Sequence, residues 1–303
     1  MEKEELKKIK AIDTMCHFSY CKPELAKAMF ERYEYKVMAT TTFKGVVRRL
    51  GLKPGEEWKA LAGLGKGSVP AMIEEMDEIG VDYVFIETLT HWSWHDHRLM
   101  SDVVVETIAE IVEESKGRVI GGAGYNPFRI SESLRDVERA VKDYGFKWVW
   151  FHPISFGMRP DDRRCYPLYA KCLELGIPVC MQSGHSAEPL PSEAGHPMCA
   201  DNVAIDFPEL KIVLTHTGWP WVQEWISMIW RHPNVYGNIG AYYPKDLDPA
   251  IIQFMDGRGQ DKVMWATRGF GLSRCKQEFL ELPIREQPKV KILRENAVRV
   301  FGL

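Results

Sequence analysis

The stretch 147–216 carries three short apolar runs: KWVWFH at 147–152, PVCMQS at 178–183 and KIVLTH at 211–216. Nearly continuous hydrophobic runs of this length are typical of strands that are buried on both faces, as in a parallel sheet. Longer amphipathic segments separate the runs, and we interpret these segments as helices. The stretch therefore predicts a repeating strand–helix unit.

The same unit recurs on both sides of this stretch. Apolar residues at helical spacing, such as Val104, Ile108 and Ile111, lie between the predicted strands. Eight such units in 303 residues predict an α/β protein with a (β/α)₈ TIM-barrel fold, as one domain over residues 1–303. The predicted strands are Ala11–His17, Val81–Glu87, Arg118–Tyr125, Lys147–His152, Pro178–Ser183, Lys211–His216, Val235–Ala241 and Lys262–Thr267.

Two features near the N-terminus bear on the predicted fold. The alternative fold, a doubly wound open sheet, needs a glycine-rich phosphate loop after its first strand, and Thr14–Tyr20 (TMCHFSY) contains none. Residues 24–68 do not follow the strand–helix alternation, so we predict a partly helical insertion that forms a lid. We interpret GLGKG at 63–67 as a flexible turn in this insertion and not as a phosphate cradle.

Composition excludes several classes of protein. The 39 basic and 42 acidic residues form no basic patch, which argues against nucleic acid as a partner. No run approaches the roughly 20 apolar residues of a membrane helix, and MEKEELKKIK at the start lacks the apolar region of a secretory leader. Seven cysteines without paired spacing predict reduced thiols and a cytoplasmic protein.

Polar side chains follow the predicted strands at their carboxyl ends, where the active sites of barrels lie. Several histidines at equivalent strand ends are hard to explain by packing alone, so we predict one shared pocket. The residues at these positions are His17, Glu87, Asn126, His152, Gln182 with His185, His216, Asn238, Tyr242 with Tyr243, and Arg268.

Four stretches of the chain resemble the amidohydrolase superfamily, in particular its aminocarboxymuconate-semialdehyde decarboxylase-like branch. They are IDTMCHF at 12–18, HPISFGMRP at 152–160, LTHTGWP at 214–220 and the ending ENAVRVFGL at 295–303. The similarity extends over nearly the whole chain in the right order. It implies a barrel with its active site at the carboxyl ends of the strands.

The resemblance also implies a metal site, and here the sequence departs from the family. Members carry His-x-His, or an acid in place of the first His, after strand 1, a His on strand 5 and an Asp on strand 8. The corresponding residues here are Met15 with His17, Gln182 and Arg268. A thioether is a weak ligand, and a guanidinium is a permanent cation that repels a metal. We therefore predict no metal and no cofactor at this position.

A second histidine cluster lies after the second predicted strand, in HWSWHDH at 91–97. Its His91, His95 and His97 could bind adventitious metal. We favour a polar, aromatic-rich element near the pocket mouth, because a loop cluster lacks a rigid second layer of contacts.

The resemblance assigns His216 to the position of the family's catalytic histidine, which predicts an acid–base role. The alternative is a structural histidine packed against Trp219 and Trp221. Arg268 either pairs with an internal acid such as Glu87 or anchors an anionic group of the substrate. We predict that His17 and Gln182 hydrogen-bond a carbonyl or oxyanion.

The remaining residues of the predicted pocket are expected to bind the substrate, a small, planar and anionic molecule. The tryptophans among them follow strand ends, where they can form aromatic walls. The predicted substrate-binding residues are His152, Asn126, Glu87, His185, Trp92, Trp219 and Tyr242.

Three function classes follow. The first is a metal-independent hydrolase for a lactone or activated carbonyl of a carboxylated ring compound. The second is a lyase that decarboxylates or hydrates an aromatic or unsaturated acid. The third is a binding protein that has lost turnover. The resemblance implies a homodimer or a higher homo-oligomer in each case.

Overall fold

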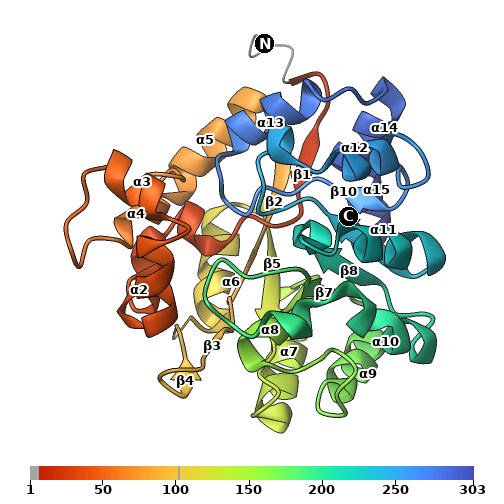
Figure 1. Ribbon diagram of the computed structural model, residues 1–303, viewed down its shortest axis with the longest axis horizontal. Helices are drawn as coiled ribbons and strands as arrows, with labels where there is room; N and C mark the ends of the chain where they lie inside the picture. The colour runs from red at the N-terminus through yellow and green to blue at the C-terminus, as the bar shows by residue number, and fades with distance from the viewer. Residues whose placement is uncertain (1–6, 102) are drawn as a thin grey trace.

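The computed structural model describes residues 7–101 and 103–303, and its centre is a sheet of eight parallel strands (Figure 1). Backbone hydrogen bonds from Thr14 N to Trp265 O (3.1 Å) and from Arg268 N to Met15 O (2.6 Å) join the two ends of the sheet, so it curls into a barrel. In spatial order the strands are β1 (Ala11–Asp13), β2 (Val81–Glu87), β5 (Val119–Gly124), β6 (Trp148–Phe151), β7 (Val179–Gln182), β8 (Ile212–Thr215), β9 (Val235–Asn238) and β10 (Val263–Met264).

The eight predicted strands and the barrel are confirmed, although most strands are shorter than predicted. The prediction that β1 continues to His17 is wrong, because the strand ends at Asp13. There the Asp13 carboxylate accepts a hydrogen bond from Met15 N (3.1 Å), and His17 has a φ of 72°. The chain thus leaves the extended conformation before His17 and turns that side chain toward the barrel mouth.

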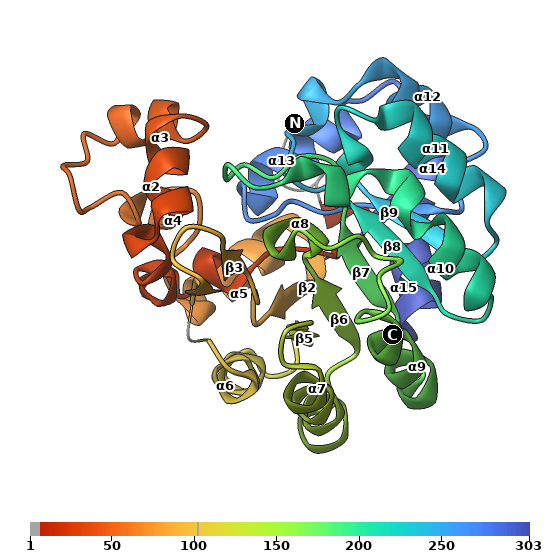
Figure 2. The same cartoon turned by 60° about the horizontal axis from the view of Figure 1, so that its bottom comes forward.

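Helices surround the sheet, as Figure 2 shows for the lower half of the barrel. The helix α12 begins as the sequence indicates, with the Asp248 carboxylate accepting from Ala250 N (2.8 Å) and Pro249 in the first turn. The outer helices are α5 (Val69–Ile79), α6 (Val105–Glu114), α7 (Ile130–Tyr144), α9 (Tyr166–Leu175), α10 (Asp201–Asp206), α11 (Val222–Arg231), α12 (Pro249–Asp256) and α13 (Leu272–Leu280).

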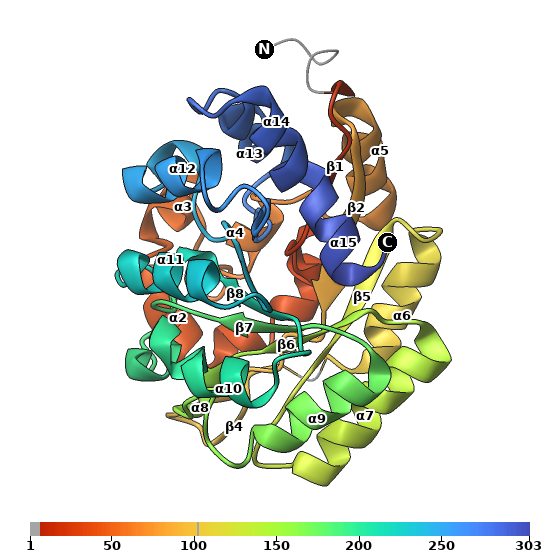
Figure 3. The same ribbon diagram turned by 90° about the vertical axis from the view of Figure 1, so that its right-hand side faces the viewer.

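Shorter elements complete the fold. The C-terminal part runs through α14 (Glu286–Val290), the π-helical turn η8 (Lys291–Glu295) and α15 (Asn296–Phe301), and η8 contacts both β1 and β10 (Figure 3). The short helix α8 (Pro153–Phe156) follows β6, and a two-stranded ribbon, β3 (Trp92–Ser93) with β4 (Arg98–Leu99), follows β2. Four further 3₁₀ turns are η4 (Ser192–Gly195), η5 (Pro197–Ala200), η6 (His216–Gly218) and η7 (Pro244–Asp246).

Residues 24–68, which we call the cap segment, consist of short helices and turns between β1 and α5. Two of its contacts fix it over the barrel mouth: Glu34 accepts from the Ser93 hydroxyl (2.8 Å), and the Thr42 hydroxyl donates to Ala187 O (3.2 Å). That the cap segment moves as a lid stays a prediction. Its elements, after η1 (Phe18–Tyr20), are η2 (Pro23–Ala26), η3 (Met29–Glu31), α2 (Tyr33–Thr40), α3 (Lys44–Arg49) and α4 (Lys59–Ala62).

Within residues 7–101 and 103–303, no helix combines the length and the apolar character needed to span a bilayer.

Candidate active site

Trp150 lies at the centre of the barrel mouth, with histidines from three strand ends around it. Its ring is 1% exposed, and ring centroids lie 6.3 Å away for His17, 6.0 Å for His152 and 5.6 Å for His216. The His91 ring packs on His152 at 4.0 Å between centroids. The β6 strand thus supplies an aromatic floor, in addition to the aromatic walls predicted from Trp92 and Trp219.

Buried polar atoms without a hydrogen-bond partner concentrate in this region. Native proteins leave few such atoms unpaired, so a concentration of them marks a place for a polar ligand or for water. In the described part of the chain they include His17 Nε2, Glu87 Oε2, both ring nitrogens of His91, Trp150 Nε1, His152 Nε2, Gln182 Oε1, Glu188 Oε1, His216 Nε2 and Arg268 Nε.

His17 and Glu87 form a buried pair at the ends of the first two strands. His17 Nδ1 makes a short hydrogen bond with Glu87 Oε1, and the Glu87 side chain is fully buried. The carboxylate orients the ring and holds the proton on Nδ1, so Nε2 remains free to exchange a proton with a ligand. Glu87 is therefore the partner of His17 and not of Arg268.

Arg268 carries an unpaired positive charge. Its side chain makes no hydrogen bond, and no carboxylate lies within 4.0 Å of it, among the residues that the structure describes. The backbone at this position is constrained, with a φ of 55° and a bond from Arg268 N to Met15 O (2.6 Å). The guanidinium therefore has its full set of donors available to an anion.

Asp13 positions the segment that carries Arg268, a role that the sequence analysis missed. Its carboxylate accepts from Thr267 Oγ1 (2.5 Å) and Thr267 N (2.9 Å), one residue before Arg268. Burial raises the pKa of Asp13 to about 7, although these hydrogen bonds act in the opposite direction.

The other histidines of the site are neutral at pH 7. Burial, and then the charge of Arg268, lower the pKa of His216 well below its ordinary value. Burial likewise lowers the pKa of His152 strongly and that of His91 to about 3. His216 Nδ1 hydrogen-bonds Thr215 Oγ1 (3.0 Å), which leaves Nε2 to face a ligand. These rings can donate or accept a hydrogen bond without adding charge.

Glu188 is a second residue that the sequence analysis missed. It lies in the loop after β7 and is 3% exposed. Burial favours its neutral form, but Arg268, His91 and the Ser186 hydroxyl together hold the pKa of Glu188 below its ordinary value. Nothing in the local sequence SGHSAEP distinguishes this acid from a surface glutamate.

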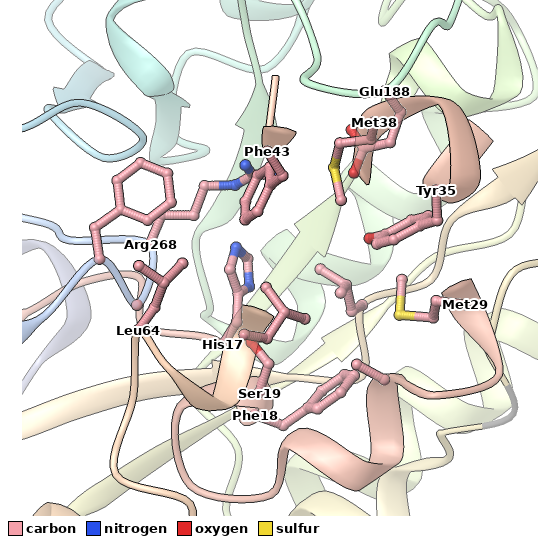
Figure 4. A pocket seen from close by; sticks show the side chains of 15 residues that line it. His17, Phe18, Ser19, Met29, Tyr35, Met38, Phe43, Leu64, Glu188 and Arg268 are labelled. Carbon is pink, nitrogen blue, oxygen red and sulfur yellow. The ribbon is translucent and has the colours of Figure 1, made fainter. Parts of the chain in front are cut away.

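A cavity of about 40 Å³ connects these groups with the cap segment (Figure 4). His17, Glu188 and Arg268 line it from the barrel, and Tyr35 and Met38 line it from α2. A cavity that accepts benzene measures about 150 Å³. The cavity in this conformation is therefore too small for a benzene ring.

The remaining predicted residues are divided between the site and its surroundings. Gln182 is buried and donates through Nε2 to His185 O (3.3 Å), with its Oε1 unpaired. Tyr242 is half-buried and close enough to Arg268 for that charge to act on its hydroxyl. His185 is exposed and contacts Trp219, itself 48% exposed, at the outer rim.

Asn126 and Trp92 do not share the cavity of Arg268. Both line a separate depression beside α6 and α7. The Asn126 carboxamide accepts from Phe128 N (3.0 Å), and Trp92 packs its ring against Phe128. The structure therefore does not bring Asn126 and Trp92 together with Arg268 in one cavity, and their substrate-binding role stays a prediction.

The donors at the strand ends do not fit a divalent metal. No group of three His, Cys, Asp or Glu side chains within the described residues is arranged to hold one. Of the residues at the family's ligand positions, Gln182 is a neutral donor and Arg268 is a cation. The HWSWHDH histidines are also dispersed: His91 is buried beside His152, whereas His95 is exposed and bonds Asp96 (2.9 Å).

The barrel, with its functional groups at the carboxyl ends of the strands, defines a TIM-barrel protein with an enzyme-type site. The sequence model of the amidohydrolase family matches residues 12–303, and the chain belongs to that family. No curated protein is significantly similar in sequence.

Solved structures share the fold over almost the whole chain. An uncharacterized TIM-barrel protein from Bordetella bronchiseptica has a TM-score of 0.74 at 25% identity, covering 97% of this chain and 99% of that one. A dihydroxybenzoic acid decarboxylase from Polaromonas, with bound manganese and an inhibitor, has a TM-score of 0.65 at 17% identity, covering 97% of each chain. A 5-carboxyvanillate decarboxylase from Sphingomonas paucimobilis has a TM-score of 0.64 at 15% identity, covering 97% and 99%.

Proposed function

We propose that this protein is a lyase that decarboxylates a small, planar, anionic acid, aromatic or unsaturated, without a metal at the family's ligand position. One observation carries the proposal: the unpaired guanidinium of Arg268 and the ring of His17, whose Nε2 is unpaired, line the same cavity. An anion anchor and a proton-transfer group are the two elements that such a reaction needs.

Arg268 is the anchor. A guanidinium can bind a carboxylate or phenolate through two parallel hydrogen bonds, and both gain strength where water is excluded. As the carbon–carbon bond breaks, its electron pair moves into the ring or the conjugated carbonyl. The fixed charge of Arg268 stabilises the oxygen that receives this density.

His17 is the proton donor. The departing carboxylate leaves as carbon dioxide, and the carbon that carried it takes one proton from His17 Nε2. His17 Nε2 first takes this proton from the solvent, and the Glu87 carboxylate stabilises the doubly protonated ring until the transfer and keeps its orientation. We propose that His216 and Gln182, with unpaired Nε2 and Oε1, hydrogen-bond other oxygens of the substrate. Since His216 does not line the cavity, we favour His17 over His216 as the proton-transfer residue.

The named neighbours support a lyase through their fold. Two of them are named as decarboxylases, of dihydroxybenzoic acid and of 5-carboxyvanillate, and the first holds manganese. In our proposal a guanidinium carries out the charge stabilisation here, because the donor set does not fit a metal.

A hydrolase is the second candidate, and the His17–Glu87 pair is the observation that favours it. A histidine supported by a carboxylate can take a proton from water as the water attacks a lactone or other activated carbonyl. Arg268 then binds the carboxylate of the ring compound.

A panel of hydroxybenzoates and unsaturated acids, incubated with protein that has been treated with a chelator, separates these functions. We expect release of carbon dioxide that is insensitive to the chelator and lost in Arg268→Met. Arg285→Met is the matched control, since it removes an exposed arginine that pairs with Asp256. Ester or lactone cleavage without carbon dioxide selects the hydrolase. Tight binding with no product selects the non-catalytic alternative.

The proposal also covers the cellular compartment and the oligomeric state of the protein. All seven cysteines are buried free thiols, which supports a reducing compartment such as the cytoplasm. A homodimer or higher homo-oligomer remains our expectation.

A further inference from the structure

The carboxylate of Glu188 faces Arg268 across the cavity. Figure 4 shows the two side chains entering from opposite sides, with the His17 ring below the Arg268 guanidinium. No ion pair within 4.0 Å joins Glu188 to Arg268 in the part of the chain that the structure describes. Glu188 Oε1 is buried and has no hydrogen-bond partner. The cavity therefore has a cationic donor at one side and an anionic acceptor at the other.

The position of Glu188 is fixed by its neighbours. The Ser186 hydroxyl donates to Glu188 Oε2 in a short hydrogen bond, and Leu190 N donates to Glu188 O (2.8 Å). The bond from the Thr42 hydroxyl to Ala187 O (3.2 Å) ties the adjacent residue to the cap segment. The carboxylate is thus held in the cavity wall by contacts within its own loop.

The groups around Glu188 keep it charged without neutralising it by direct contact. Arg268, after β10, favours the ionised carboxylate through its charge, and the neutral His91 ring, after β2, lies beside it. On the side of α2, Tyr35 faces it, and burial and the charge of Glu188 raise the pKa of Tyr35 well above its ordinary value. Tyr35 therefore stays protonated and its hydroxyl is directed to donate to the Glu188 side chain, which leaves the other carboxylate oxygen for a ligand.

A ligand that spans the cavity meets both charges. Its carboxylate, bound to Arg268, leaves the far end of the molecule opposite Glu188 Oε1. A hydroxyl or ammonium group there satisfies the unpaired oxygen, whereas a second carboxylate meets a like charge in an enclosed site. Juxtaposed like charges are strongly unfavourable in such surroundings, and an unpaired buried acceptor is costly as well.

We propose that Glu188 is the specificity-determining residue of this site and that it selects acids that carry a hydrogen-bond donor, above all an ammonium group, opposite their carboxylate. This inference rests on the anchor role of Arg268 in the proposed function. It adds that the substrate is bipolar and that dicarboxylates are excluded.

Calorimetric titration of the full-length protein with three probes at neutral pH tests the inference. The probes are benzoate, meta-(aminomethyl)benzoate and isophthalate, which differ in the charge opposite the carboxylate. We expect the wild type to bind the aminomethyl compound at least about tenfold tighter than benzoate, and isophthalate at least about tenfold weaker. In Glu188→Gln, which keeps the shape and the Ser186 contact, both ratios should fall to within about threefold.

Glu193→Gln is the matched control, because Glu193 lies in η4, within the same connection between β7 and α10, but is exposed. It should retain both wild-type ratios, which shows that loss of one negative charge in the loop is not the cause. The inference is overturned if the affinity ratios are unchanged in Glu188→Gln. It is also overturned if this variant binds none of the three probes, because its Arg268 has no opposing charge and should still bind their carboxylates. Failure of the proposed function gives a different result. In that case no acid of the panel is turned over, while the affinity ratios still shift in Glu188→Gln as expected.

Discussion

The substitution Glu87→Gln tests the His17–Glu87 pair most sharply. Gln has the shape of Glu and can still contact His17 Nδ1, but its carboxamide can donate to that nitrogen. The proton of the neutral ring then moves to Nε2, which loses the lone pair that takes up the proton for transfer, and no carboxylate stabilises the doubly protonated ring. The variant thus changes which nitrogen holds the proton while the packing of a fully buried side chain is retained.

The expected loss follows from the hydrogen bond that is removed. Hydrogen bonds to charged groups contribute about 1.5–3 kcal/mol, and each 1.36 kcal/mol corresponds to a factor of ten. We therefore expect kcat/KM on an active acid to fall about ten- to two-hundredfold. Nitrogen NMR of the His17 ring should show the proton on Nδ1 in the wild type and on Nε2 in the variant.

Glu75→Gln is the matched control. Glu75 is also buried, but it binds Tyr20 Oη (2.5 Å) and Ser273 N (3.3 Å) beside α13 and does not line the cavity. It should lower the stability without changing the His17 ring spectrum. If Glu87→Gln leaves both kcat/KM and the position of the ring proton unchanged, the assignment of His17 is refuted.

Three further predictions concern stability, a second histidine and the cap segment. Burial raises the pKa of Asp13 from 3.8 to about 7, so the folded state retains a proton that the unfolded chain releases. The contribution of Asp13 to the free energy of unfolding should fall by up to about 4 kcal/mol between pH 4 and pH 7, and this fall should be absent in Asp13→Asn. The prediction is contradicted if urea unfolding gives the wild type and Asp13→Asn the same dependence of stability on pH. His216→Ala should lower kcat/KM by at least about tenfold if its free Nε2 binds the substrate, and an unchanged rate in a steady-state assay removes it from the mechanism. A Thr42→Cys/Ala187→Cys disulfide should hold the cap segment closed and prevent calorimetric binding of benzoate until it is reduced; unimpaired binding to the oxidised protein refutes a lid.

The fold was predictable because it depends on local patterns. Buried strands such as Val179–Gln182 and Ile212–Thr215 are continuous apolar runs in the sequence. The residue that follows each run can therefore be identified from the sequence. The positions of His17, Gln182, His216 and Arg268 around one barrel mouth follow from that pattern alone.

The partners of these residues were not predictable in the same way. Glu188 lies in an irregular loop, and Asp13 lies inside a strand, so neither belongs to a periodic pattern that indicates its role. The pairing of Glu87 with His17 depends on the adjacency of β1 and β2 and on the turn at His17, where φ is 72°. Likewise, Trp150 was one of ten tryptophans, and only the curvature of the sheet places it under the histidines.

The most direct test of the central claim is a crystal structure of the protein with bound benzoate, recorded with X-rays that reveal manganese and zinc by anomalous scattering. We predict that the carboxylate lies within hydrogen-bond distance of the Arg268 guanidinium, that His17 Nε2 faces the carbon bearing it, and that no anomalous peak lies between them. An anomalous peak beside His17, with Arg268 turned away from the ligand, would contradict the account.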